Sequence, residues 1–209
     1  MITLDHIAVA GENLDDCINH AETQLGTTLP MGGEHAQMGT HNALCQFGPD
    51  TYLELIAPNP SAPAPSRPRW FGLDQPPAPP RLTAWVLRCE NLATTLETAR
   101  AAGVNLGSAV PFARDHLRWL FSLRDDGAIP LDGAAPMIIE WQTPGPHPAN
   151  GMADLGLSLN ALEIKTPQAD ALLRLCDALG LTNHPQISQG PETQLRAQIS
   201  SAGRTLTLT

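Results

Sequence analysis

The chain has 209 residues, and 42% of them are hydrophobic, which is enough to bury the core of one large domain or two small ones. Its four cysteines stand far apart without a CxxC pair, so a disulfide framework and a zinc knuckle are both disfavoured. The net charge is −9 with only 12 lysine and arginine residues, and no basic cluster offers a footprint for nucleic acid.

No apolar run is long enough to cross a bilayer, and the N-terminal stretch MITLDHIAVA has no basic residues ahead of an apolar core. Widely spaced cysteines also suit a reducing compartment. We therefore expect a cytoplasmic protein with neither a membrane nor a nucleic-acid partner. Its expected partner is a small-molecule ligand, and association into a homodimer is compatible with the sequence.

An internal repeat organises most of the chain. The segment LDHIAVAGENLDD (residues 4–16) recurs as LTAWVLRCENLAT (residues 82–94). In each copy an alternating stretch predicts a strand, and apolar residues at helical spacing predict an amphipathic helix after it. The two copies therefore begin with the same β-α unit, but His6 of the first is aligned with Ala84 of the second.

The two copies also end alike. Residues 42–57 predict two strands around a Gly-Pro-Asp turn, and the segments 117–123 and 136–141 predict two more. The sequence thus predicts a first β-α-β-β-β module over residues 1–57 and a second over residues 81–142. In this alignment Glu54 and Glu140 occupy the same place in the closing strand of each module.

A proline-rich crossover, residues 58–80, joins the two modules and is expected to be extended, since its prolines forbid a long helix or a central strand. Within it, Trp70 and Phe71 form the only apolar cluster. These aromatic residues either pin the crossover onto the sheet, which we favour, or form a lid over a ligand pocket.

The C-terminal segment, residues 155–209, predicts a strand, a helix and a hairpin, and so a third, shorter related module. Ala161 and Thr207 stand at its positions for His6 and Glu54. Because it keeps none of the ionisable groups, this module is expected to be scaffold.

The repeated β-α-β-β-β unit, with a histidine on the first strand and a glutamate on the last, resembles the vicinal oxygen chelate superfamily. The stretches GGEHAQMGTHNAL, YLELI, RWFGLD, LRW and PMIIEWQTPGPHP resemble its glyoxalase-like domain subfamily, and the resemblance covers nearly the whole chain. It implies an α+β fold in which the repeated modules form curved, half-barrel mixed sheets, here with an extra C-terminal module.

The resemblance also implies a metal site between the modules, with ligands from the first and fourth strands of each. The matching positions are His6, Glu54, Ala84 and Glu140. Because Ala84 cannot ligate, the implied set is one histidine and two glutamates, which suits divalent zinc, iron, manganese, nickel or cobalt. The missing ligand could be water, the metal could be weakly bound or absent, or a second histidine could come from His35, His41 or His116.

The two glutamates carry the predicted chemistry. Alternation in YLELI places Glu54 on one face of its strand, where a buried carboxylate needs a cation, hydrogen-bond donors or a raised pKa. Glu140 faces the same demand. Two glutamates converging on one cavity are candidates for acid/base catalysis even without a metal, and Glu140 is the expected base.

Further polar and aromatic residues are predicted to hold the substrate. A polar stretch beside Gly32-Gly33 is expected near the mouth of the cavity, either as a simple polar loop or as a ligand contact. The predicted substrate-binding residues are His35, His41, Asn42, Arg118, Trp141 and Trp70. Alternation turns either Arg118 or Trp119 away from the cavity, and we expect Trp119 to pack outward. His147, which lies between two prolines, is expected on the surface.

Two classes of function are compatible with these patterns. The first is a glyoxalase-like, metal-assisted lyase or isomerase that acts on a small substrate with vicinal oxygens. The second is a non-catalytic protein that binds or sequesters a small molecule, as the bleomycin-resistance proteins of the superfamily do. An extradiol dioxygenase is disfavoured because the second histidine is missing from its strand.

Overall fold

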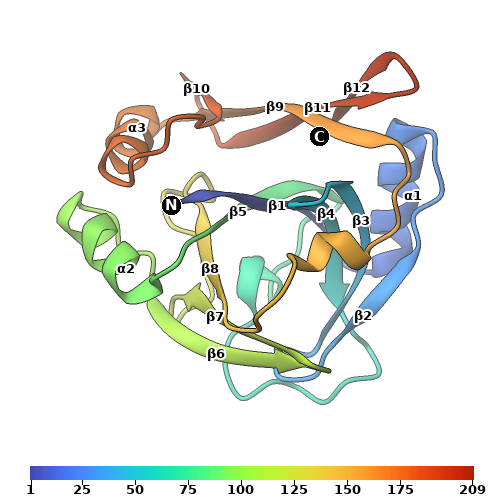
Figure 1. Ribbon diagram of the computed structural model, residues 1–209, viewed down its shortest axis with the longest axis horizontal. Helices are drawn as coiled ribbons and strands as arrows, with labels where there is room; N and C mark the ends of the chain where they lie inside the picture. Colours follow the sequence, from blue (N-terminus) through green and yellow to red (C-terminus); the bar gives the residue numbers. More distant parts are fainter.

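A computed structural model describes residues 1–209, whose strands form two sheets (Figure 1). The larger, eight-stranded sheet has the order β2-β3-β4-β1-β5-β8-β7-β6 and curls into a half-barrel. Its first half consists of β1 (Thr3–Ala10), α1 (Leu14–Leu25), β2 (Met31–His35), β3 (Thr40–Gly48) and β4 (Thr51–Pro58). Its second half consists of β5 (Arg81–Arg88), α2 (Leu92–Ala101), β6 (Ser108–Arg114), β7 (Leu117–Leu123) and β8 (Met137–Trp141). The predicted α+β class and the repeated β-α-β-β-β modules are confirmed.

The repeated Glu-Asn-Leu motif has a local cause, because its asparagine starts a helix in each copy. The side chain of Asn13 accepts a hydrogen bond from the backbone N–H of Asp16 at 2.8 Å, and Asn91 accepts one from Thr94 at 2.9 Å. Such N-caps satisfy backbone donors that have no partner within the helix. Gly26 then ends α1 in the left-handed conformation, with φ of 68°.

The two halves join through the antiparallel pair β1–β5, and the register of that pair is symmetric. His6 pairs with Val86, and Ala8 pairs with Ala84. Since the sequence repeat aligns His6 with Ala84 and Ala8 with Val86, each strand meets its own copy about a local twofold axis. The concave face of the half-barrel is therefore built by matching positions of the two halves.

Each face of the sheet has its own apolar cluster. On the convex side, 36 buried residues, Ile7, Val9 and Trp85 among them, join the sheet to the helices and to the C-terminal module. On the concave side, a smaller cluster of 15 residues includes Ala8 and Ala84. It also includes Trp70 and Phe71 from the crossover, where a short 3₁₀-helix, η1 (Trp70–Gly72), lies inside the half-barrel.

The C-terminal module differs from the other two in its sheet order. It consists of β9 (Leu157–Thr166), α3 (Ala169–Ala178), β10 (Gln186–Gln189), β11 (Gln194–Ser201) and β12 (Arg204–Leu208), arranged as β10-β9-β11-β12. Here the strand after the helix, β10, pairs in parallel with β9, whereas β2 and β6 lie at the outer edges of the large sheet. The module thus has a strand order of its own, and it covers the convex face of β1 and β5 as a second layer (Figure 1).

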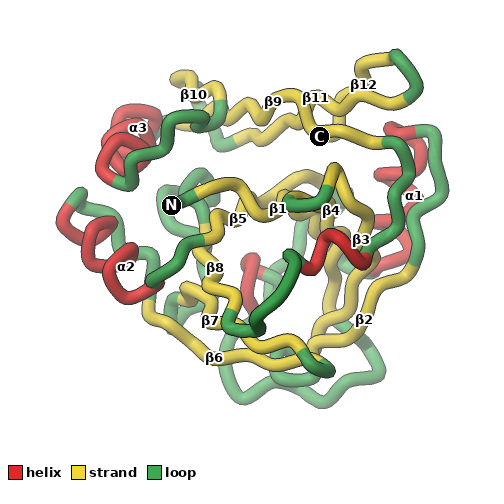
Figure 2. Tube along the Cα trace, viewed as in Figure 1, coloured by secondary structure: helices red, strands yellow, loops and turns green.

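Two long loops close the half-barrel (Figure 2). One is the crossover that carries η1. The other, residues 142–156, links β8 to β9 and contains a second 3₁₀-helix, η2 (Pro148–Gly151). We call residues 142–156 the strap; it is tied to the first module by hydrogen bonds from Gln46 to Met152 and from Asn150 to Pro49. No helix of the chain has the length and apolar character needed to span a membrane.

Candidate functional site

A small cavity of about 40 Å³ lies on the concave face of the large sheet, and the two halves of the sheet line it unequally. The first half contributes the polar side chains of His6, His35, Asn42 and Glu54, and the second half contributes Arg114. The second half and the crossover contribute an aromatic wall of Trp70, Phe71, Trp119, Phe121 and Trp141. Apart from Arg114, the ionisable groups thus lie on the first half of the sheet, and the aromatic wall lies on the other side of the cavity.

His6 and Glu54 face each other across the polar side. The Nε2 atom of His6 lies 3.5 Å from Oε2 of Glu54, and the side chain of Asn42 donates to the other carboxylate oxygen of Glu54 at 2.7 Å. The ring of Tyr52 stacks on the His6 imidazole, with 4.4 Å between ring centroids. These neighbours fix the orientation of both ionisable groups.

Asp5 holds His6 from behind. Its Oδ1 atom lies 2.7 Å from Nδ1 of His6, and its Oδ2 atom accepts hydrogen bonds from Trp141 at 2.9 Å and from His147 at 2.8 Å. Neighbouring residues of a regular strand point to opposite faces. A register shift between Leu4 and His6 interrupts the β1–β5 pairing here and allows Asp5 and His6 to meet.

The arrangement stabilises charge on all three groups. Burial opposes charge on Asp5, but hydrogen bonds from His147 and His6 hold its pKa well below the ordinary value. Burial likewise opposes a charged imidazole, but the bonds to Asp5 and Glu54 raise the pKa of His6 to about 9. His6 in turn outweighs the effect of burial on Glu54 and lowers the pKa of that carboxyl. An imidazolium between two carboxylates results.

The stability of the protein should therefore depend on pH. Because its pKa is raised, His6 stabilises the folded protein fully at pH values below its unfolded pKa of 6.5. This stabilisation is lost as the pH rises through about 9. Asp5, with a lowered pKa, contributes above its unfolded value of 3.8 and loses that contribution in acid. We expect the free energy of unfolding to fall by about 2 kcal/mol between pH 6.5 and 9.

Urea unfolding at a series of pH values measures this decline. The His6→Gln variant should lose most of it, because glutamine does not titrate. An equally steep decline in the variant would show that another group is responsible.

His35 lies on the same side of the cavity as His6 and Glu54, and its imidazole is neutral. Burial lowers the pKa of His35 to about 4. Its Nε2 atom lies 3.2 Å from a guanidinium nitrogen of Arg114, and its Nδ1 atom lies 3.4 Å from the hydroxyl of Thr40. Since arginine only donates, Nε2 is the acceptor, and the ring proton is on Nδ1.

The glycine pair in β2 allows the polar side to pack this closely. A Cβ atom at Gly32 would collide with Oδ1 of Asn42, the atom that accepts a hydrogen bond from the backbone N–H of Gly33 at 2.8 Å. A Cβ atom at Gly33 would lie 3.3 Å from the guanidinium of Arg114. The backbone at Gly32 and Gly33 therefore lies close to the side chains of Asn42 and Arg114, where a Cβ atom would not fit easily.

Glu140 does not reach the cavity, so its predicted place beside His6 and Glu54 is wrong. Glu54 pairs with Ala8, and the matching residue Val86 pairs with Met137, so Met137 is the true counterpart of Glu54. Glu140 points to the other face of β8. Its carboxylate accepts a hydrogen bond from the backbone N–H of Leu92 at 2.7 Å, at the start of α2, where negative charge is favourable.

The remaining predicted residues divide into two groups. The cavity is lined by His35, Asn42, Trp70 and Trp141. His41 and Arg118 do not line it: His41 alternates with Asn42 along β3, and the exposed Arg118 donates to the backbone carbonyls of Asp115 and Leu117. Trp119, which was expected to face outward, lines the cavity instead, because alternation on β7 turns Arg118 away.

Sequence reasoning missed Asp5, Arg114 and His147. His147, expected on the surface, has a side chain only 7% exposed, since η2 folds it onto Asp5. An acidic residue next to a strand histidine was the available signal for Asp5. No signal was available for Arg114, which reaches the cavity from β6 at the far edge of the sheet.

The donors in this cavity do not fit the metal centre that the sequence resemblance implies. Of the four positions, only His6 and Glu54 carry ligating atoms that face each other, while Ala84 and Met137 stand at the matching places of the second half. Nowhere do three or more histidine, cysteine, aspartate or glutamate side chains form a group that could hold a metal ion. Two protein ligands are fewer than metal sites in proteins ordinarily provide.

An outer chamber of about 570 Å³ adjoins the cavity and runs between β2, the β6–β7 turn and the strap. Four residues line both spaces: Leu44, Arg114, Pro148 and Met152. These four side chains therefore form the boundary between the outer chamber and the cavity.

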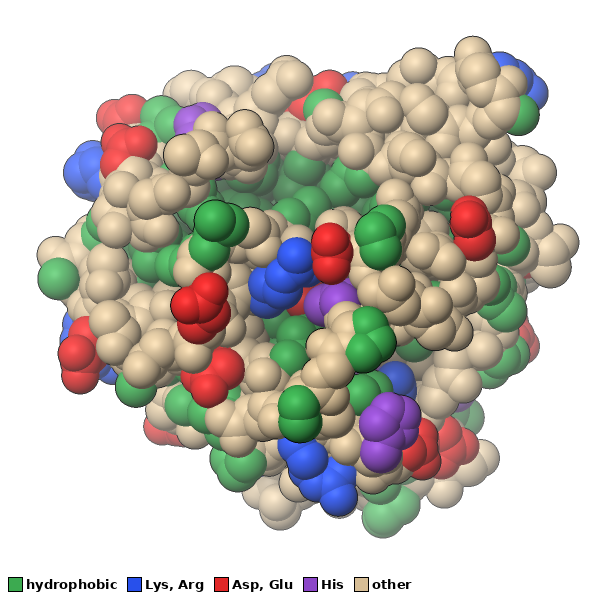
Figure 3. All heavy atoms as spheres, viewed as in Figure 1, with side chains coloured by type: hydrophobic (Ala, Val, Ile, Leu, Met, Phe, Trp, Pro, Cys, Tyr) green, Lys and Arg blue, Asp and Glu red, His purple; other side chains and the backbone are tan.

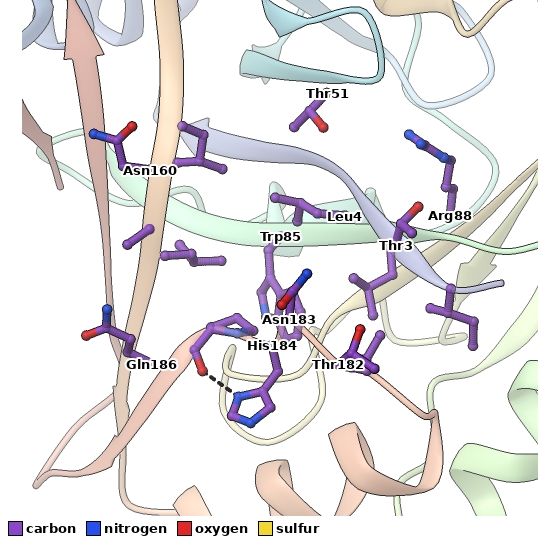
Figure 4. A pocket seen from close by; sticks show the side chains of 17 residues that line it. Thr3, Leu4, Thr51, Trp85, Arg88, Asn160, Thr182, Asn183, His184 and Gln186 are labelled. Atoms are coloured by element: carbon purple, nitrogen blue, oxygen red, sulfur yellow. Dashed lines mark hydrogen bonds between the residues drawn. The ribbon is translucent and has the colours of Figure 1, made fainter.

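A larger hollow lies elsewhere, between the two sheets. It measures about 690 Å³, and an apolar floor is visible within it on the surface (Figure 3). Figure 4 shows the side chains that line it, with Leu4 and Trp85 from the large sheet and Asn160 and His184 from the C-terminal module. Its one arginine, Arg88, is paired with Asp50 at 3.8 Å, so the hollow holds no cluster of free ionisable groups.

Comparison with known proteins supplies a family and a fold. The family model for a glyoxalase-like domain matches residues 4–180. A hypothetical protein from Staphylococcus aureus is 13% identical, covers 93% of this chain and 88% of its own, and superposes with a TM-score of 0.64. Methylmalonyl-CoA epimerase from Mycobacterium tuberculosis is 22% identical over 68% of this chain and 88% of its own, with a TM-score of 0.43. No curated protein matches the sequence.

Proposed function

The chain belongs to the glyoxalase-like domain family of the vicinal oxygen chelate superfamily, and from that premise we propose that it is an isomerase or lyase that moves a proton on a small oxygenated substrate without a metal ion. In this proposal Glu54 is the base and His6 is the acid. The observation that carries it is the buried pair of His6 Nε2 and Glu54 Oε2, 3.5 Å apart at the wall of a cavity.

The proposed step is proton transfer next to a carbonyl group. The Glu54 carboxylate takes a proton from the carbon beside the carbonyl, the electron pair of the broken C–H bond forms a C=C bond, and the π pair of the carbonyl moves to its oxygen. The imidazolium of His6 donates its Nε2 proton to that oxygen as negative charge develops on it. Delivery of a proton to the opposite face of that carbon, or to the former carbonyl carbon, completes an isomerisation, and loss of a leaving group from the next carbon completes an elimination.

His6 supplies the positive charge that a metal ion would otherwise supply. Asp5 keeps the imidazole oriented, because it accepts from Nδ1 at 2.7 Å and is itself fixed by Trp141 and His147. Charge stabilisation by a preorganised donor is strong where water is excluded, and the aromatic wall provides that exclusion. The cavity of about 40 Å³ limits the reacting part of the substrate to a few atoms.

A second candidate is a binding protein without chemistry. The aromatic wall favours it, since Trp119 and Trp141, with ring centroids 5.5 Å apart and planes inclined at 50°, give a ligand apolar contact area. In this alternative His6 and Glu54 only orient the ligand by hydrogen bonds. The two candidates differ in whether a bound compound exchanges a proton with solvent.

Proton exchange in deuterated water separates them. The protein is incubated with pyruvate, 2-oxobutyrate, lactate and hydroxyacetone, and loss of each proton signal is followed by NMR. The proposal predicts that at least one compound loses a proton from the carbon beside its carbonyl, and that His6→Gln abolishes this exchange. A compound that binds, as measured by tryptophan fluorescence, but does not exchange would support the binding protein and reject the enzyme.

A further inference from the structure

Arg114 occupies a place that the proposed reaction leaves unexplained. It is the last residue of β6, and its side chain lines both the cavity and the outer chamber. A ligand that passes from the chamber to His6 and Glu54 must pass this guanidinium. The residue is partly buried, so its charge is screened less by water than that of an exposed arginine.

Arg114 is also the exception among the arginines of this chain. Six of the eleven are exposed to solvent and need no partner. The partly buried ones other than Arg114 each have an aspartate within 4.0 Å, in the pairs Arg67–Asp125, Arg69–Asp74, Arg88–Asp50 and Arg124–Asp126. Arg114 has no carboxylate within that distance. Partly buried charges are normally paired, so a cation without a partner at the mouth of a cavity points to an anion supplied by a ligand.

The neighbour of Arg114 does not replace such an anion. His35 accepts one hydrogen bond from the guanidinium at 3.2 Å, and burial, which lowers the pKa of His35 to about 4, keeps the ring neutral. A guanidinium carries five N–H donors in a planar fork. The contact with His35 therefore orients the fork and leaves other donors for the two oxygens of a carboxylate.

A second donor in the same cavity lacks a partner. The indole N–H of Trp70 is buried, and no protein atom accepts a hydrogen bond from it. Trp70 lines the cavity and packs edge-on against His35, with ring centroids 4.9 Å apart. Because an indole N–H can only donate, its missing partner is an acceptor, as the oxygens of an acid are.

We infer that Arg114 binds the carboxylate of the substrate at the mouth of the cavity, so that the substrate is a small carboxylic acid rather than a neutral carbonyl compound. This inference rests on the proposed function for the identity of the reacting atoms. The carboxylate lies against Arg114, and the adjoining carbonyl carbon and its neighbour extend inward toward His6 and Glu54. Arg114 is thus a specificity-determining residue.

The test compares two ligands of similar size that differ in charge. Pyruvate carries a carboxylate, and hydroxyacetone has a hydroxymethyl group in its place. Their dissociation constants are measured by calorimetry or tryptophan fluorescence for the wild type and for Arg114→Leu, Arg114→Lys, Trp70→Phe and Arg118→Leu. Arg118→Leu is the matched control, since it removes the same charge from the adjacent strand β7 without touching the cavity.

The wild type should bind pyruvate more tightly than hydroxyacetone. Arg114→Leu should weaken pyruvate binding by about tenfold or more and change hydroxyacetone binding by less than about twofold. Arg114→Lys should recover part of the lost pyruvate affinity. Circular dichroism checks that both variants fold, and the lysine variant keeps the test valid if the leucine variant does not. Trp70→Phe should weaken pyruvate binding several-fold, and Arg118→Leu should leave it unchanged.

Four results would overturn the inference: equal loss of both ligands in Arg114→Leu, an equal loss in Arg118→Leu, wild-type binding of hydroxyacetone as tight as that of pyruvate, or no saturable binding of either. These readouts are binding constants and do not depend on turnover. Charge-selective binding without proton exchange would sustain the role of Arg114 and reject the enzyme, whereas exchange without charge selectivity would do the reverse.

Discussion

Glu54→Gln should lower the rate of proton exchange by at least about 100-fold, because the neutral amide cannot accept the proton that the carboxylate takes. Glutamine has nearly the same shape, and its side-chain oxygen can still accept the hydrogen bond that Asn42 donates at 2.7 Å. Substrate binding should therefore change much less than the rate. NMR exchange rates and fluorescence titrations of the same samples measure both quantities.

Glu140→Gln is the matched control for this prediction. It makes the same chemical change at the other conspicuous glutamate, whose carboxylate accepts from Leu92 and Gln142 outside the cavity. We expect its exchange rate to stay within about twofold of the wild type. Its free energy of unfolding should fall by at most about 1 kcal/mol, because the contact at the start of α2 is weaker without the negative charge. Loss of exchange in Glu140→Gln, with retention in Glu54→Gln, would return the catalytic role to the residue that the sequence alignment favoured.

Asp5→Asn should reduce the free energy of unfolding by about 2–4 kcal/mol, because it breaks up a buried network of charged hydrogen bonds. Asp5 is fully buried and receives three donors, from His6, Trp141 and His147. An amide offers one oxygen to these donors and points its own N–H groups at others. Without Asp5 the pKa of His6 should also fall, so that exchange slows at neutral pH.

Urea denaturation at pH 6.5 measures the stability change. Asp126→Asn provides the comparison, because Asp126 is exposed and its bond to Arg124, 2.6 Å long, is open to water. The free energy of unfolding of Asp126→Asn should fall by less than about 1 kcal/mol. Similar losses in the two variants would mean that the Asp5 network stabilises the fold no more than a surface ion pair does.

The repeated architecture could be predicted because its signals are local. Alternation, helical spacing and the capping Asn13 and Asn91 recur at the same interval, and each acts over a few residues. The position of His6 and of Glu54 on their strands follows from the same periodicity. The registers in which the closing strands β4 and β8 pair with their neighbours do not follow from this periodicity. Backbone pairing sets them, across loops of different length.

Glu140 illustrates this limit. It was aligned with Glu54 by residue type, but the backbone register aligns Glu54 with Met137, three positions earlier in the chain. An odd displacement reverses the face of a strand, so the side chain of Glu140 leaves the cavity. Asp5 reaches His6 through a register shift in β1, and Arg114 reaches the cavity through the curl of the sheet. The sequence beside His6 offered a signal for Asp5, but no local pattern predicts the register shift or the curl.

If His6 and Glu54 move a proton without the help of a metal ion, proton exchange should survive the removal of all divalent metal. The protein is purified without an affinity tag and treated with a chelator until metal analysis finds no divalent ion, and proton exchange is then measured before and after adding zinc, iron, manganese, nickel or cobalt. Exchange should continue in the metal-free protein at an unchanged rate, and no added ion should increase it. Loss of exchange on metal removal, with recovery on addition of one of these ions, would contradict a metal-free proton transfer.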